Sequence, residues 1–216
     1  MIKVEMHCHT YFSEDGFITP KSMVSQCRKK NLDCVCITDH DIFRGAIEFS
    51  KKIDTLKIVY GQEVTTGQGD LIGLFLKEEI PSGMGLQNTI AAIKEQQGIV
   101  YLPHPLDEFR KSSVKKDQAE LILKNVDIIE VFNSRTLNEK YNRIAKEFAL
   151  QNNKITAVGS DAHHFLELGL SHVLMEDFSN ANDFLNNLKE AKKITQRCPR
   201  LLRLYLKGLK LQTGKE

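Results

Sequence analysis

Ile2-Lys3-Val4-Glu5-Met6-His7-Cys8-His9 is the stretch that decides the fold, because it joins a predicted strand to a pair of histidines. Ile2–Met6 reads as a short buried strand, and the histidines follow at its end. Residues two apart in an extended chain point to the same side, so His7 and His9 face one way and Cys8 faces the other. Two such imidazoles can hold a metal ion. A histidine pair by itself is more simply explained as surface or core residues.

Further polar clusters follow along the chain, most of them just after a predicted strand. Gly16 permits a tight bend that can aim Asp15 back at the first pair. Asp161 and His163 repeat the two-apart spacing of His7 and His9. The clusters are Ser13-Glu14-Asp15-Gly16, Thr38-Asp39-His40-Asp41, Gly61-Gln62-Glu63, His104-Pro105 and Gly159-Ser160-Asp161-Ala162-His163.

Strands and helices alternate along the chain, which predicts an α/β fold with a mostly parallel sheet. The expected strands are Ile2–Met6, Cys34–Ile37, Ile58–Tyr60 running into Glu63, Leu71–Leu76, Ile99–Leu102, Ile128–Phe132, Ile155–Val158 and His172–Met175. The expected helices begin at Pro20 and lie near Phe43–Ile53, Leu86–Gln96, Lys116–Leu123, Leu137–Gln151 and Ala181–Ala191. An open doubly wound sheet and a closed barrel both fit this pattern. Polar clusters at the ends of many strands favour the barrel, because a barrel brings strand ends to one face.

The composition is that of one globular domain, residues 1–216, without a recognisable linker or repeat. A net charge of +2 is too small to predict nucleic-acid binding by itself. No stretch approaches the roughly 18 apolar residues of a membrane span, and the N-terminus lacks the pattern of a signal peptide. Five unevenly spaced cysteines argue against a disulfide framework. We therefore expect buried cysteines and a cytoplasmic location.

The polar clusters together predict a metal centre. Each residue has an ordinary explanation, such as a helix cap for Asp15 or a hydrogen-bonded core imidazole for His40. Jointly those explanations weaken, because so many ionisable groups at one rim would repel or lose solvation unless cations neutralised them. The predicted ligands are His7, His9, Asp15, His40, Glu63, His104, Asp161 and His163.

The order of the motifs H-C-H-T-Y-F-S-E-D-G, T-D-H-D, G-Q-E, H-P and G-S-D-A-H resembles the PHP (polymerase and histidinol phosphatase) family of metallophosphoesterases. The resemblance implies a distorted, TIM-like seven-stranded (β/α) barrel with two or three divalent ions (Zn, Mn or Fe) at its C-terminal face. It further implies three ligand groups. They are His7, His9, Glu63 and Asp161 for a first ion, Glu63 and His104 for a second, and Asp15, His40 and His163 for a third.

One position departs from the family pattern. Many relatives have a histidine ligand for the second ion where this chain has Asn133. An amide oxygen is a weaker ligand, so the second ion would bind loosely or depend on Glu130 or water.

The predicted activity is hydrolysis of a phosphate ester of a small phosphorylated metabolite, such as a nucleotide, by a metal-activated hydroxide. The candidate catalytic residues are Asp39, His40, Glu63 and Arg135. Arg135 could grip phosphate through its bidentate fork, and a solvated surface arginine is an equal alternative. Arg44 and Arg110 rank below it. Asp39, His40, Asp41 and His164 are candidates for the proton donor, and Asp39 could instead orient a ligand.

Two other functions and one segment stay open at this stage. The alternative functions are a metal-dependent amidohydrolase, which shares the H-x-H motif, and a non-catalytic metal-stabilised module. Residues 197–216 predict a basic amphipathic helix with Arg200, Arg203, Lys207 and Lys210 on one face. It could bind a membrane surface, RNA or a partner. We favour a helix whose leucines close the barrel and whose basic face is solvated.

Overall fold

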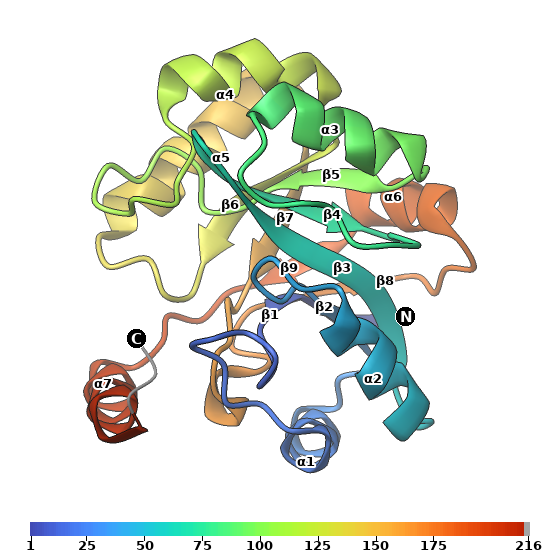
Figure 1. Ribbon diagram of the computed structural model, residues 1–216, viewed down its shortest axis with the longest axis vertical. Coiled ribbons are helices and arrows are strands. Elements are labelled where there is room, and N and C mark those ends of the chain that lie inside the picture. Colours follow the sequence, from blue (N-terminus) through green and yellow to red (C-terminus); the bar gives the residue numbers. More distant parts are fainter. Residues whose placement is uncertain (214–216) are drawn as a thin grey trace.

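A computed structural model of the chain describes residues 1–213, and among these the side chains of residues 207 and 209–213 are not described. Nine strands form one sheet in the order β7-β6-β5-β4-β3-β2-β1-β8-β9 (Figure 1). Their bounds are β1 Ile2–Cys8, β2 Cys34–Ile37, β3 Lys57–Thr66, β4 Gly69–Leu74, β5 Ile99–Leu102, β6 Ile128–Asn133, β7 Ile155–Gly159, β8 His172–Met175 and β9 Lys192–Ile194.

The sheet curls until its β7 edge meets the end of β1, with β8 and β9 beyond β1. The segment just after β7 pairs with the end of β1, since His9 N donates to Ala162 O at 2.7 Å and Ala162 N donates to His7 O at 3.2 Å. A bridge between Cys8 and Ala162 continues this pairing. The result is a nearly closed barrel, which confirms the predicted α/β barrel class. The carboxyl end of β1 therefore lies next to the carboxyl end of β7.

The expected seven strands and mostly parallel pairing were wrong in detail. Nine strands are present, and four of the eight strand pairings are antiparallel. The direct cause is the turn at Gly67 and Gln68, which joins β3 to β4 as a hairpin. β9 adds an antiparallel edge strand beyond β8. A hairpin reverses the chain within a few residues, so β4 and β5 run against each other.

The helices lie outside the sheet, with α3 and α4 at one end of the view and α1 and α2 at the other (Figure 1). Thr19 caps α1 by accepting from Ser22 N, and Pro20 occupies the first helical position. The bounds are α1 Pro20–Lys30, α2 Arg44–Lys52, α3 Leu86–Glu95, α4 Lys116–Ile122, η1 Leu123–Asn125, α5 Glu139–Gln151, η2 Phe165–Glu167, α6 Ala181–Lys189 and α7 Arg200–Thr213.

Two apolar clusters hold these layers together. The larger runs along the sheet under α3, α5 and α6, and the smaller joins β1 and β2 to α1 and α2 through Met23 and Phe49. All five cysteines are buried and free, as expected from their spacing. Burial raises the pKa of the Cys27 thiol to about 12. A thiol in such surroundings behaves as a small apolar side chain.

Helix α7 differs from the solvated basic helix that we expected. Arg203 points inward, and its Nη2 donates to the carbonyl oxygens of Ser134 at 2.9 Å and Thr136 at 3.4 Å. Leu206 is buried, whereas Leu201 is 81% exposed. Contact with backbone carbonyls satisfies the guanidinium better than the apolar leucines could, so Arg203 faces the barrel. Arg200 is exposed, as expected for a solvated basic face, and the side chains of residues 207 and 210 lie outside the described part. Among residues 1–213 no helix is long and apolar enough to cross a membrane.

Candidate metal centre

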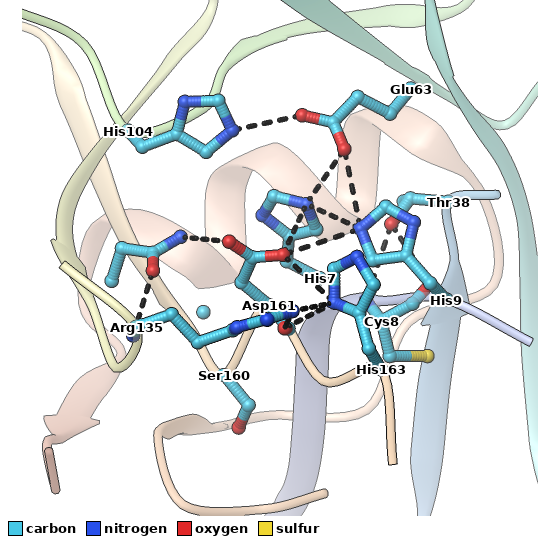
Figure 2. Close-up of polar contacts among 12 residues, drawn as sticks. His7, Cys8, His9, Thr38, Glu63, His104, Arg135, Ser160, Asp161 and His163 are labelled. Carbon is cyan, nitrogen blue, oxygen red and sulfur yellow. Dashed lines mark hydrogen bonds and ion pairs between the residues drawn. The ribbon is translucent and has the colours of Figure 1, made fainter. Parts of the chain in front are cut away.

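The predicted ligands come together at one face of the barrel. His7 and His9 lie at the end of β1, Glu63 lies in β3, and His104 and Asp161 follow β5 and β7. Figure 2 shows their side chains pointing toward a common point. A parallel bridge between His40 and Glu63 places the residue after β2 beside this group. The convergence of side chains from separate strand ends was the central expectation from the sequence.

Four of these side chains form a compact, fully buried set. His7 Nε2 lies 3.1 Å from His9 Nε2 and 3.2 Å from Glu63 Oε2. His9 Nε2 lies 3.2 Å from Glu63 Oε2 and 3.4 Å from Asp161 Oδ1, and the distance from His7 Nε2 to Asp161 Oδ1 is 3.7 Å. Four ligands about 2.0–2.1 Å from a central ion would be about 3.3–3.4 Å apart at the corners of a tetrahedron. The spacing and the two-imidazole, two-carboxylate chemistry therefore fit a divalent ion.

A buried carboxylate behind this set orients His7. Glu130 Oε1 lies 3.1 Å from His7 Nδ1 and also accepts from the hydroxyl of Tyr101 at 2.9 Å. A proton held on Nδ1 leaves the lone pair of Nε2 directed into the set, and this is the usual arrangement behind metal-binding histidines. From the sequence, Glu130 was expected only as a substitute ligand for the second ion.

A second set lies nearer the opening of the site. His163 Nε2 is 2.9 Å from Asp15 Oδ2, and His40 Nε2 is 3.9 Å from Asp15 Oδ1. The rings of His40 and His163 both stack against His9, with centroids 4.2 and 4.1 Å from its own, and their own centroids lie 5.7 Å apart. One ligand atom from each of these three histidines lies within 4.8 Å of the others. His40 and His163 together with His9 therefore form a second group that could hold a divalent ion, and the Asp15 carboxylate lies beside it.

The position between Glu63 and His104 is less complete. Glu63 Oε1 and His104 Nε2 are 2.9 Å apart, and His104 Nδ1 is buried with no hydrogen-bond partner among the described residues. Asn133 Nδ2 donates to Glu130 Oε2 at 2.9 Å and to Asp161 Oδ2 at 3.2 Å, while its Oδ1 accepts from Arg135 N at 2.9 Å. Because its partners are two carboxylates and an N–H, Asn133 turns its amino group, not its oxygen, toward the centre.

Glu130 cannot replace the missing ligand either. Its Oε2 accepts from His104 N at 2.7 Å as well as from Asn133 Nδ2, and its Oε1 is shared by His7 and Tyr101. Each carboxylate oxygen thus already has two partners. The expectation that Glu130 or Asn133 could complete the second site finds no support in this geometry.

The protonation of the cluster follows from the balance of burial and charge. Burial lowers the pKa of His9, but the carboxylates of Asp161 and Glu63 outweigh it and raise the pKa to about 9. Burial, the Arg135 guanidinium and His9 lower the pKa of His163 to about 3. Burial would raise the pKa of Glu63, but His7 and His40 hold it well below its usual range. The centre thus combines ionised carboxylates with histidines of which some are neutral and ready to bind metal.

A cavity of about 520 Å³ opens above the centre. Its floor includes Asp15, His40, Glu63, His104, Asp161 and His163. The rest is lined by three arginines, three large apolar side chains, two carboxylates and two hydroxyl side chains, namely Arg110, Arg135, Arg203, Phe109, Leu137, Leu206, Asp107, Glu167, Ser112 and Thr136. Such a cavity suits an anionic group at the metal centre and an organic group at the rim.

Arg135, the arginine proposed from the sequence to bind phosphate, lines this cavity. Its Nη1 contacts His163 Nδ1 and lies 3.5 Å from the carbonyl oxygen of Asp161, and its Nε is 3.7 Å from Glu167 Oε1. Arg110 contacts Asp161 more closely than Arg135 does, with Nη1 2.7 Å from Asp161 Oδ2. Arg44 lies over the ring of Phe12 and is not among the cavity-lining residues.

The other proton-donor candidates lie behind the cavity. Asp39 accepts from Thr10 Oγ1 at 2.7 Å and from Ser13 Oγ at 2.9 Å, which fits the positioning role considered for it. Asp41 Oδ1 accepts from Thr65 N at 2.7 Å. His164 caps η2. None of these three residues lines the cavity.

Asp70 is a site residue that sequence analysis missed. It lies in β4, is 3% exposed, and has a carboxylate oxygen within 4.8 Å of ligand atoms of His40 and Glu63. Burial, aided by the Glu63 charge, raises its pKa to about 8. The sequence signal for a buried carboxylate was weak in both cases. Asp70 directly precedes the apolar run Leu71–Leu76, and Glu130 lies inside the apolar run Ile128–Phe132.

Comparisons with known proteins agree with this geometry. The family model described as PHP domain matches residues 5–213. Protein MJ0417 of Methanocaldococcus jannaschii is 34% identical over 201 residues, covering 87% of this chain and 79% of that protein. A Caldicellulosiruptor saccharolyticus protein named "Probable phosphatase" is 26% identical, covering 86% of this chain and 92% of that protein.

A solved structure supports the fold. It is a two-domain protein of Bacteroides vulgatus that contains a predicted PHP-like metal-dependent phosphoesterase, and it superposes with a TM-score of 0.70 at 18% identity. The match covers 90% of this chain and 65% of that one, so this chain spans a little under two thirds of its length.

Proposed function

This chain belongs to the PHP domain family, and from that premise we propose that it hydrolyses a phosphate ester of a small phosphorylated molecule, such as a nucleotide, at a centre of divalent ions. The observation that carries the proposal is the set of His7, His9, Glu63 and Asp161 on the floor of an arginine-lined cavity. Divalent ions at such a centre, whether Zn, Mn or Fe, supply an activated hydroxide and positive charge beside the phosphoryl group.

The side chains of this chain would bind and orient the substrate. The guanidinium groups of Arg110 and Arg135 are placed to neutralise phosphoryl oxygens, since both lie against Asp161 in the cavity wall. Phe109 and Leu137 are 75% and 71% exposed at the rim, where they can cover the organic part of the substrate. His40 is one-third exposed and faces the cavity, so it remains the best-placed catalytic candidate on the second set.

A comparison of two substrate classes tests the proposal. Protein purified without added metal is first subjected to elemental analysis, which should show more than one divalent ion per chain. Its activity is then measured with an aryl phosphate and with an N-acyl aryl amide, followed by a panel of phosphorylated metabolites that includes nucleotides. We expect phosphate release and no amide cleavage.

Matched variants show whether the measured activity belongs to this protein or to a contaminating enzyme. Glu63→Gln should reduce phosphate release at least 100-fold, because the carboxylate belongs to the metal set, whereas Glu147→Gln on the exposed side of α5 should leave it unchanged. Amide cleavage that depends on Glu63 would replace the proposal by an amidohydrolase. Metal binding with neither activity would favour a metal-stabilised interaction module.

A further inference from the structure

The two carboxylate oxygens of Asp161 have different neighbours. Its Oδ1 faces the histidines of the first set, 3.4 Å from His9 Nε2 and 3.7 Å from His7 Nε2. Its Oδ2 faces the opposite side, where it accepts from Arg110 Nη1 at 2.7 Å and from Asn133 Nδ2 at 3.2 Å. If Oδ1 of Asp161 binds a metal ion, Oδ2 would stay held by a guanidinium and an amide.

The loop that carries Arg110 is built to hold this position. Its backbone turns back on itself, with Arg110 N donating to Asp107 O at 3.3 Å and Ser113 N donating to Arg110 O at 3.2 Å. Lys115 Nζ donates to the carbonyl oxygens of Asp107 and Arg110 at 2.7 and 2.8 Å. The Arg110 side chain is 23% exposed and lies in the cavity wall. Hydrogen bonds within the loop therefore help to hold Arg110 in contact with Asp161.

The position between Glu63 and His104 has too few ligand atoms for an ion of its own. Two further ligand groups lie beside this position, namely His7 with His104 and Asp161, and His40 with Glu63 and Asp70. When the first set uses His7 Nε2 and Asp161 Oδ1 and the second set uses His40, the uncommitted atoms next to His104 are its own Nε2 and Glu63 Oε1, 2.9 Å apart. Asn133 presents an amino group there, and both oxygens of Glu130 are fully hydrogen-bonded. Protein-bound catalytic ions ordinarily have at least three protein ligands. A cation here would also lie beside the positive charge of Arg110.

We infer that Arg110 takes the place of a metal ion, so that this centre binds two divalent ions per chain and not three. The ions occupy the His7, His9, Glu63, Asp161 set and the Asp15, His40, His163 set. The guanidinium neutralises Asp161 Oδ2 and, with four further N–H donors, offers hydrogen bonds to phosphoryl oxygens. The metal count stands independently of the activity, whereas the phosphoryl contact rests on the proposed function.

Metal stoichiometry tests the count directly. The protein is stripped with a chelator, reloaded with Mn²⁺ or Zn²⁺ alone, freed of excess metal and analysed for metal per chain. Wild type should hold two ions. The double variant R110M/N133H removes the competing charge and adds an imidazole next to Glu130 and Asp161, so it should hold three. R44M is the matched control, because Arg44 lies outside the cavity, and it should hold two.

Three tightly held ions in wild type would overturn the inference. A folded double variant that still holds two would also overturn it, because Arg110 and Asn133 would then not be what limits the count. If the double variant does not fold, the metal content of wild type alone tests the count, and inorganic phosphate binding to R110M and R110K tests the contact of Arg110 with phosphoryl oxygens. We expect R110M to bind at least 10-fold more weakly than wild type and R110K to recover part of that loss. Equal binding by all three contradicts the role of Arg110.

The count and the proposed function fail in different ways. A protein with two ions that hydrolyses no phosphate ester retains the count and loses the proposed function. A protein with three ions that hydrolyses phosphate esters does the reverse.

Discussion

At the residue scale, protons compete with metal for the same buried atoms. Burial opposes a charge on His9, but the carboxylates of Asp161 and Glu63 prevail and raise its pKa to about 9. Below that pH the imidazole of the metal-free protein carries a proton that a metal must displace. The raised pKa also means that protonated His9 stabilises the metal-free fold below its unfolded pKa near 6.5, and that this contribution disappears as pH rises through about 9.

Metal uptake should therefore depend on pH. We expect the affinity of the metal-free protein for Zn²⁺ to rise at least tenfold per pH unit from about pH 7 to 9, because His9 must lose a proton and so must His7, whose pKa the surrounding carboxylates also hold well above its usual value against the effect of burial. Competition titration with a chromophoric chelator measures the affinity, and proton release into weak buffer gives the count. His172→Gln, away from the cavity, should not change the slope. A flat profile would contradict this assignment.

Glu130 should matter for metal binding although it lies behind the ligands. Glu130→Gln replaces the carboxylate that accepts from His7 Nδ1 and puts an amino group next to four hydrogen-bond donors, those of His7, Tyr101, His104 and Asn133. The orientation of His7 should then be less fixed, and metal affinity should fall about 10–100-fold. The same titration measures it, with circular dichroism as the check on folding. Glu120→Gln, on the exposed side of α4, is the control. Equal affinities in the two variants would remove Glu130 from the centre.

At the element scale, strand β7 approaches β1 and β6 closely at Gly159. A Cβ atom there would lie 2.2 Å from Glu130 Oε1 and 2.7 Å from His7 Cβ. Only a residue without a side chain lets the strand pass at this distance. The backbone of β7 therefore helps to set the positions of His7 and Glu130.

Gly159→Ala should destabilise the protein by about 1–3 kcal/mol, the usual range for overpacking, and should lower its metal content. Urea unfolding gives the free energy and elemental analysis gives the metal. Gly67→Ala, at the β3–β4 turn, introduces a Cβ with no atom within 4 Å and should change stability by less than about 0.5 kcal/mol. Similar losses in both variants would mean that the close approach at Gly159 is unimportant.

Short apolar runs that end in polar residues were enough to predict the strands from β1 to β8. A strand that is buried on both faces of a sheet consists mostly of apolar residues, so it gives such a run. Apolar runs could not give strand direction, and so the hairpin at Gly67 was missed. β9 is a lysine-containing strand of three residues without an apolar signal. The predicted ligands come together because motifs at strand ends share a face. Glu130, Asp70 and Arg203 escaped prediction because their partners are distant in sequence, and local patterns carry no information about such neighbours.

At the scale of the whole molecule, α7 closes one side of the cavity. Arg203 reaches the carbonyl oxygens of Ser134 and Thr136, and Leu206 is buried at the same wall. The ring of Tyr205 meets His164 edge-on, with centroids 6.3 Å apart. Within the described side chains of α7, these contacts of Arg203, Tyr205 and Leu206 attach the helix to the barrel.

Arg203→Ala should loosen that attachment. Losing the two hydrogen bonds costs about 1–3 kcal/mol of local stability, so protease cleavage near Gln196–Arg200 should become roughly tenfold faster. The KM for an aryl phosphate should rise more than kcat falls, because a cavity wall moves. Arg200→Ala removes an exposed side chain from the same helix and should match wild type in both measurements. Unchanged cleavage and KM in Arg203→Ala would show that α7 is held by other contacts.

The pairing of β1 with β8 has a consequence for biosynthesis. Val4 in β1 pairs with Val173 in β8, 169 positions later in the chain. At translation rates of about 5–20 residues per second, the first strand waits roughly 10–30 s for that neighbour to leave the ribosome. During the wait its free edge can pair with other chains. Yield of folded protein should therefore depend on chaperones that bind the nascent N-terminal strand.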